Sequence, residues 1–241
     1  MTQLGKIKSI TAYPLKYPEP HDHCALRYIT LARVETEDGT VGWGECISQF
    51  PESCQATKII IEQGYAPLLV GETALEVDKC WHKMNDRIWW YGPQGIAAFA
   101  MSAVDMALWD LKGKLLGLPL SNLIGGTHTK SVVAMASIHL DMDDLDWSVN
   151  EFHWFAEQGY FIVKGGWGTS PTSVFGIDET RDLALVRRIR ETIGNDIDMV
   201  IDVLGARVLW DLQTAIYRIQ QMEQFNLLWI EEPLHPQDYV A

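Results

Sequence analysis

The chain has 241 residues, of which 47% are hydrophobic, and it carries a formal net charge of -13. This length is enough for one large domain or two smaller ones with buried cores. The negative charge argues against a nucleic-acid-binding surface, because such a surface needs clustered Lys and Arg. It is compatible with a small anionic substrate held beside a local cation.

The N-terminal residues lack the apolar core of a signal peptide, and no apolar run approaches membrane-spanning length. The four cysteines do not have the paired spacing of a metal site and suit a reducing compartment; they are Cys24, Cys46, Cys54 and Cys80. We therefore expect a cytoplasmic protein without nucleic-acid or membrane partners.

Three segments with alternating apolar side chains open the chain, over residues 6–17, 28–36 and 41–45. Together with the turn pair Asp38-Gly39 they predict an antiparallel meander. The polar loop between the first two segments contains His21 and His23. Two histidines in a loop are more often solvated than functional, but we keep both as candidate substrate contacts.

From Ser53 onward the apolar spacing becomes helical, with long helices predicted over about 74–90 and 96–116. Four large aromatic residues recur near the first of these helices, and their spacing predicts that they belong to the core; they are Trp81, Trp89, Trp90 and Tyr91. The strands and helices together predict an α+β domain over residues 1–127.

The second half of the chain alternates strand and helix patterns, which is typical of a parallel (β/α) barrel. The predicted strands cover 131–139, 160–164, 198–202 and 227–231, and the predicted helices cover 149–158, 181–193 and about 210–222. A closed barrel of this type needs eight strands and about 250 residues. We therefore predict the first half of a (β/α)8 barrel over residues 128–241, in the first part or a fragment of a longer protein.

Two of these strands stop at carboxylates, Asp202 and Glu231. Parallel strands direct their carboxyl ends to one face, so the two acids should lie side by side and suit a hard divalent cation such as Mg²⁺. Acids after strands are also common as helix caps or loop residues, and the spacing alone leaves that alternative open.

The segment from Ala103 to Gly126, AVDMALWDLKGKLLGLPLSNLIGG, closely resembles a signature of the enolase superfamily in its mandelate racemase-like branch. The run Ile230-Glu231-Glu232-Pro233 and the strand ending at Asp202 match the same family. Within this signature, Gly113 and Gly117 are expected to allow close packing or to end the helix. The resemblance implies an N-terminal capping domain and a barrel that carries the active site.

The resemblance also implies three carboxylate ligands for one Mg²⁺, on three successive strands. Asp202 and Glu231 match the first two, the third would follow residue 241, and Glu232 is expected to lie beside the ligands. Lys164 matches the first lysine of a Lys-x-Lys pattern, so we expect it to be catalytic or to bind the substrate carboxylate. Gly166 replaces the second lysine, and Leu204 stands where many relatives have asparagine.

These features favour a lyase that uses Mg²⁺ to remove the proton next to a carboxylate and then dehydrates an acid sugar to a 2-keto-3-deoxy acid. The absence of a second lysine makes a two-base racemase less favoured. A racemase, epimerase or cycloisomerase of the same superfamily is the alternative, and an inactive truncated product is a third. We expect this fragment alone to be inactive and the complete protein to be a homo-oligomer acting on a small carboxylate.

Overall fold

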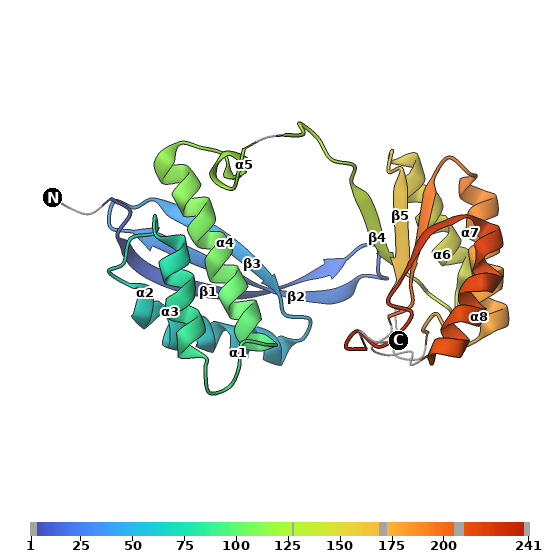
Figure 1. Cartoon of the computed structure of the whole chain (residues 1–241), viewed down its shortest axis with the longest axis horizontal. Coiled ribbons are helices and arrows are strands. Elements are labelled where there is room, and N and C mark those ends of the chain that lie inside the picture. Colours follow the sequence, from blue (N-terminus) through green and yellow to red (C-terminus); the bar gives the residue numbers. More distant parts are fainter. Residues whose placement is uncertain (1–3, 127, 169–172, 205–209, 239–241) are drawn as a thin grey trace. The chain divides into compact units, whose positions relative to one another are not determined.

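The computed structural model describes residues 4–126, 128–168, 173–204 and 210–238. The chain divides into two compact units (Figure 1). The first comprises residues 1–18 and 25–130, and the second comprises residues 19–24 and 131–241. The short turn at residues 19–24 therefore belongs to the second unit, although the strands on either side of it belong to the first.

The first unit contains a three-stranded sheet in the order β1-β2-β3, formed by Ile7–Glu19, Ala25–Thr36 and Val41–Ile47. Strands β2 and β3 pair antiparallel, as the Asp38-Gly39 turn predicts. Its smaller helices are α1 (Pro51–Ile59), the π-helix η1 (Ile60–Tyr65), α2 (Ala66–Leu69), α3 (Val77–Arg87) and α5 (Leu120–Leu123). This is the predicted α+β arrangement.

Helix α4 (Ile96–Leu116) lies against strands β2 and β3 and contributes much of the core of the first unit (Figure 1). Two glycines of β3 make this close approach feasible. A Cβ atom at Gly42 would lie 2.1 Å from the carbonyl oxygen of Ala107, and one at Gly44 would lie 2.0 Å from that of Ala103. The small side chains of α4 and the glycines of β3 thus form one tightly packed interface.

The two signature glycines of α4 have the roles expected of them. Gly117 ends the helix in the left-handed conformation, with φ of 65°, which only glycine adopts readily. A Cβ atom at Gly113 would lie 2.9 Å from the carbonyl oxygen of Leu118, so this position permits a close approach of the exit loop.

The prediction that the aromatic cluster lies in the core is wrong. Helix α3 ends at Arg87, so the residues after it leave the helical face on which the prediction depended. Trp89 and Trp90 are 75% and 79% exposed, Tyr91 is 55% exposed and Trp81 is 36% exposed. The buried positions near this helix are held instead by Val77, Cys80, Met84 and Ile88.

The second unit contains a four-stranded parallel sheet in the order β4-β5-β6-β7, with α6, α7 and α8 packed on one side (Figure 1). The strands are Met135–His139, Ile162–Gly166, Asp198–Asp202 and Leu227–Glu231. The helices are α6 (Leu145–Glu157), α7 (Glu179–Ile193) and α8 (Leu212–Met222), followed by the short 3-10 helix η2 (Glu223–Phe225). This confirms the predicted fold class of successive parallel β/α units.

Each of the three outer helices of the second unit begins at an aspartate whose carboxylate accepts a hydrogen bond from a backbone N–H of the first turn. These residues are Asp144, Asp178 and Asp211. Strand β4 begins four residues later than predicted, because Val132 and Val133 are 87% and 68% exposed and precede the buried part of the sheet. Among the described residues, no helix is long and apolar enough to cross a membrane.

Candidate active site

The carboxyl ends of the four parallel strands place one row of residues across the sheet. His139 pairs with Gly166, Gly166 with Asp202, and Asp202 with Glu231. Their neighbours along the strands, such as Ile138 and Ile201, are buried in the core beneath the helices. Side chains alternate between faces along a strand, so this row lies on the face opposite the helices.

Lys164 links the two predicted metal-binding acids. It lies two residues before the end of β5 on the same face as Asp202 and Glu231, and its Nζ donates to Oδ2 of Asp202 at 3.1 Å and to Oε1 of Glu231 at 2.7 Å. The side chain of Asp202 is only 2% exposed and that of Glu231 is 34% exposed. The structure therefore brings together the three residues that the sequence singled out.

The pKa shifts of this cluster follow from these contacts. Burial alone would lower the pKa of Lys164, but the hydrogen bonds to Glu231 and Asp202 outweigh burial, and the net effect raises it. The hydrogen bond from Lys164 lowers the pKa of Glu231. At neutral pH the cluster is consequently an ammonium held between two carboxylates, so in this state Lys164 is a cation rather than a base.

Two further groups hold the Asp202 carboxylate. The backbone N–H of Leu204 donates to Oδ1 at 2.9 Å, and Nε1 of Trp167 donates to Oδ2 at 3.0 Å. Both residues have left-handed backbone conformations, with φ of 55° and 59°. The contact at position 204 thus comes from the backbone and does not require a polar side chain. Trp167 was not predicted; its position three residues after Lys164, where β5 ends, was the available signal.

Glu232 follows Glu231 directly and lies close enough to interact with the charges of the cluster. Partial burial and the carboxylates of Asp202 and Glu231 raise its pKa. Its backbone φ is 46°, so the chain turns sharply where β7 ends. This location agrees with an acid beside the ligands, although its role stays a prediction.

Gly166 occupies a position that has no room for a side chain. A Cβ atom there would lie 2.5 Å from Cβ of Asp202 and 2.7 Å from its carbonyl oxygen. The end of β6 therefore approaches β5 closely at the point where the lysine of the Lys-x-Lys pattern would stand.

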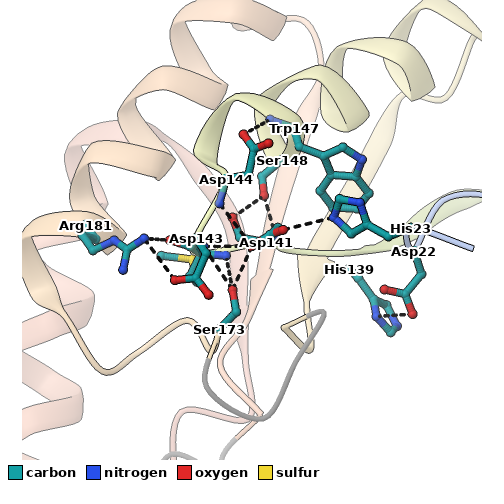
Figure 2. Close-up of polar contacts among 11 residues, drawn as sticks. Asp22, His23, His139, Asp141, Asp143, Asp144, Trp147, Ser148, Ser173 and Arg181 are labelled. Carbon is teal, nitrogen blue, oxygen red and sulfur yellow. Dashed lines mark hydrogen bonds and ion pairs between the residues drawn. The ribbon is translucent and has the colours of Figure 1, made fainter. Parts of the chain in front are cut away.

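The turn at residues 19–24 is fixed by its two histidines. Nδ1 of His21 lies 2.7 Å from Glu151 on α6, with its ring against Trp154 and Phe155. Nε2 of His23 lies 3.0 Å from Asp141, with its ring stacked on Trp147 (Figure 2). A role in substrate contact for either histidine stays a prediction, since the observed contacts are with the protein itself.

Between these histidines, Asp22 faces His139 (Figure 2). Its Oδ2 lies 3.2 Å from Nδ1 of His139, and the two side chains are 8% and 16% exposed. The sequence did not indicate this pair, because the partners are far apart along the chain and the histidine ends a strand whose apolar pattern predicts an ordinary buried strand.

The donor set suits part of a magnesium site. Within the described ranges, no three His, Cys, Asp or Glu side chains are grouped so as to hold a metal ion. Asp202 and Glu231 nevertheless offer carboxylate oxygens from neighbouring strands, and a cationic nitrogen already lies between them. Carboxylate oxygen is the ligand type that Mg²⁺ prefers, and Mg²⁺ often binds through one or two carboxylates. These residues therefore fit two of the ligands of such an ion.

Comparison with known families supports this reading of the sheet. Residues 22–125 match the N-terminal domain of the mandelate racemase / muconate lactonizing enzyme family. Residues 149–241 match the enolase C-terminal domain-like family. The chain therefore belongs to the mandelate racemase / muconate lactonizing enzyme-like branch of the enolase superfamily.

Individual relatives include enzymes with different reactions. The chain is 30% identical over 245 residues to the D-galactarolactone cycloisomerase of Agrobacterium fabrum, covering 98% of this chain and 61% of the relative. It is 33% identical over 218 residues to the L-talarate/galactarate dehydratase of Salmonella typhimurium, covering 87% of this chain and 50% of the relative. The chain thus spans about half to three fifths of the length of these relatives.

A solved structure gives a similar picture. The mandelate racemase/muconate lactonizing protein of Paracoccus denitrificans, complexed with magnesium, superimposes with a TM-score of 0.78 at 30% identity. The match covers 95% of this chain and 59% of that one.

Proposed function

We propose that the complete protein is a Mg²⁺-dependent acid-sugar dehydratase. It would remove the proton from the carbon next to a carboxylate and eliminate water, giving a 2-keto-3-deoxy acid. The observation that carries this proposal is the cluster of Lys164, Asp202 and Glu231 at the carboxyl ends of neighbouring strands. The family membership and the relatives named as dehydratases support it.

Asp202 and Glu231 would hold the metal ion. When bound, Mg²⁺ would supply positive charge for the carboxylate oxygens of the substrate, on which charge builds up as the proton leaves. Trp167 and the backbone N–H of Leu204 would keep Asp202 oriented, because hydrogen bonds to a ligand fix its direction and tune its affinity.

Lys164 would bind and orient the substrate carboxylate. Its ammonium already contacts two carboxylates, and an incoming acid would offer a third in the same place. Its raised pKa keeps it charged near neutral pH. The base that takes the α-proton would then come from elsewhere, since position 166 carries no side chain.

A cycloisomerase is the second candidate, favoured by the relative from Agrobacterium fabrum that covers most of this chain. A racemase that uses two bases is less favoured, because Gly166 removes one candidate base and the close approach of β6 leaves no room for a larger residue.

The test uses the complete protein, Mg²⁺ and a panel of acid sugars that includes galactarate, L-talarate, D-galactonate, L-rhamnonate and arabinonate. We expect loss of water from at least one of them, detected as a new 2-keto acid. Asp202→Asn, Glu231→Gln and Lys164→Met should each lower turnover by at least about 100-fold, as removal of a group that stabilises developing charge does. Conversion of an acid into its epimer, or ring opening or closure without a 2-keto-3-deoxy product, would favour the isomerase.

A further inference from the structure

We propose that His139, oriented by Asp22, is the general acid that protonates the leaving hydroxyl of the substrate. This proposal rests on the proposed function, because it assigns a residue to the elimination of water. It also assigns a purpose to the turn at residues 19–24, which would bring Asp22 to the active-site face of the sheet.

The position of His139 is the first support. It shares one row with Gly166, Asp202 and Glu231 and lies on the face that holds Lys164. Neighbouring strands are about 4.8 Å apart, so the Cα atoms of positions 139 and 202 are separated by about 10 Å. The position between them in the row is Gly166, which carries no side chain.

The pairing with Asp22 is the second support (Figure 2). A carboxylate beside one ring nitrogen fixes the tautomer and orientation of an imidazole and strengthens the proton affinity of the other nitrogen. Nδ1 lies 3.2 Å from Oδ2 of Asp22 as an ion pair without hydrogen-bond geometry, so the proton that is exchanged with the substrate would lie on Nε2. Among the described residues, Lys164, Asp202 and Glu231 are charged groups of this face, with Glu232 beside them.

The cost of placing Asp22 is the third support. Its Oδ1 is buried and has no hydrogen-bond partner among the described residues, an arrangement that costs about 1–3 kcal/mol. The next two residues, His23 and Cys24, have left-handed backbone conformations with φ of 49° and 58°, which are unfavourable for residues other than glycine. Left-handed residues are ordinary in tight turns between strands, but a turn that served only to connect two strands would not need a buried carboxylate oxygen without a partner.

The histidines on either side of Asp22 then act as anchors. His21 binds Glu151 and packs on Trp154, while His23 binds Asp141 and stacks on Trp147. These contacts hold both ends of the turn on the second unit and determine where Asp22 lies between them.

The proposed step is balanced as follows. A base takes the α-proton, and the electrons of that C–H bond move into the carboxylate group. They return to form a carbon–carbon double bond as the C–O bond at the next carbon breaks. The departing oxygen keeps the electrons of that bond, takes the proton from Nε2 of His139 and leaves as water. The enol that remains becomes the 2-keto-3-deoxy acid, and the imidazole regains its proton from solvent.

The first measurement needs no substrate. Imidazole resonances of the complete protein are followed by NMR against pH in wild type and in Asp22→Asn, with His153 on α6 as the internal control, because its partner is Glu157 on the same helix. Loss of the neighbouring carboxylate should lower the pKa of His139 by about 1 unit and leave that of His153 unchanged. An unaltered His139 pKa would show that Asp22 does not control the imidazole and would overturn the proposed pairing.

The second measurement separates acid from base. His139→Gln is incubated in deuterated water with Mg²⁺ and the acid sugar that wild type dehydrates. We expect dehydration to fall by about 100-fold or more, while deuterium still enters the α-position of unreacted substrate. His153→Gln, on the exposed side of α6, should behave as wild type in both assays.

Each other outcome overturns a particular statement. Loss of both exchange and dehydration in a folded His139→Gln protein would make His139 the base or a binding group, and the general-acid role would be wrong. Retention of both would make the pair purely structural. A wild type that neither exchanges nor dehydrates any acid of the panel would refute the proposed function itself. If Asp22→Asn fails to fold, His139→Gln still decides the role.

Discussion

In the proposed metal site, the ammonium of Lys164 competes with Mg²⁺ for the carboxylates of Asp202 and Glu231, so we expect Lys164→Met to bind Mg²⁺ more tightly than wild type does. In the folded protein the ammonium of Lys164 lies 3.1 Å from Asp202 and 2.7 Å from Glu231. Under the proposed function, a dication bound by these acids would displace this ammonium. Methionine has a similar length without charge, so its introduction removes the competitor while leaving both carboxylates in place.

The magnitude can be worked from the contacts. Without metal, the variant loses two charge-assisted hydrogen bonds and leaves the buried Asp202 carboxylate without a cation. Loss of a buried ion-pair partner costs about 3–5 kcal/mol. Trp167 and the N–H of Leu204 still bind Asp202, and Glu231 reaches solvent, so we expect a loss of about 2 kcal/mol. A tenfold gain in Mg²⁺ affinity would return about 1.4 kcal/mol at high metal concentration.

The assay is urea unfolding of wild type and Lys164→Met, each in EDTA and in saturating Mg²⁺. Lys114→Met is the matched control, because Lys114 also bonds an acid, Asp110, and among the described residues it contacts no second carboxylate. Mg²⁺ should raise the unfolding free energy of Lys164→Met more than that of wild type. The difference in stability between Lys114→Met and wild type should be the same in EDTA and in Mg²⁺. Adding Asp202→Asn should remove the gain. Equal stabilisation of wild type and Lys164→Met would refute the view that the ammonium and the metal compete for one place.

Three further outcomes follow from the first unit and the thiols. Gly44→Ala should destabilise the fold by about 1–3 kcal/mol, because its Cβ would overlap the backbone of α4. Gly64→Ala should be nearly neutral in the same unfolding assay, because its Cβ would meet only Ile60, at 3.9 Å. Hydrogen bonds from Lys79 and Lys83 lower the pKa of Glu72 from 4.5 to about 2, so its stabilising contribution is complete above pH 4.5 and is lost as the pH falls toward 2. The stability difference between wild type and Glu72→Gln should be about 1 kcal/mol near neutral pH, because the carboxylate is partly solvated. It should disappear between pH 4.5 and 2, and a constant difference would refute the assignment. Of the four thiols, only the exposed Cys24 should react with a thiol reagent in the native state. Cys46, Cys54 and Cys80 are buried, and burial raises the pKa of Cys46 and Cys80 to about 11. Labelling of Cys80 before unfolding would contradict this prediction.

Local sequence patterns predicted the ends of helices and strands correctly wherever the element's own residues determine them. Helix α4 and strands β6 and β7 end where the sequence predicts, because apolar periodicity, a glycine cap and terminal carboxylates mark these boundaries. The pattern failed at the start of β4, where Val132 and Val133 have β-branched side chains but precede the register with β5, which begins at Met135 in the described structure. It failed again at Trp89 and Trp90, since a helical spacing has no meaning beyond the last turn of α3.

The sequence predicted those contacts of the candidate site that follow from strand order and missed those between distant segments. Lys164, Asp202 and Glu231 end or nearly end successive strands, and the parallel register alone brings them together. The contact between Asp22 and His139 joins a turn of the N-terminal meander to the first strand of the parallel sheet. No periodicity connects such distant segments. The bond from Trp167 to Asp202 likewise depends on a left-handed backbone at a residue that is not glycine.

Gly166 connects the packing of the sheet with the choice of reaction. Sequence alone suggests that Gly166→Lys could supply a second base and some epimerase activity. The structure argues against this simple exchange, because any Cβ at position 166 would lie within 2.7 Å of both Cβ and the carbonyl oxygen of Asp202. A lysine there would push away the strand end that carries the first metal ligand. The close approach of β5 and β6 therefore excludes a base at position 166. A second base for epimerisation would have to come from another strand.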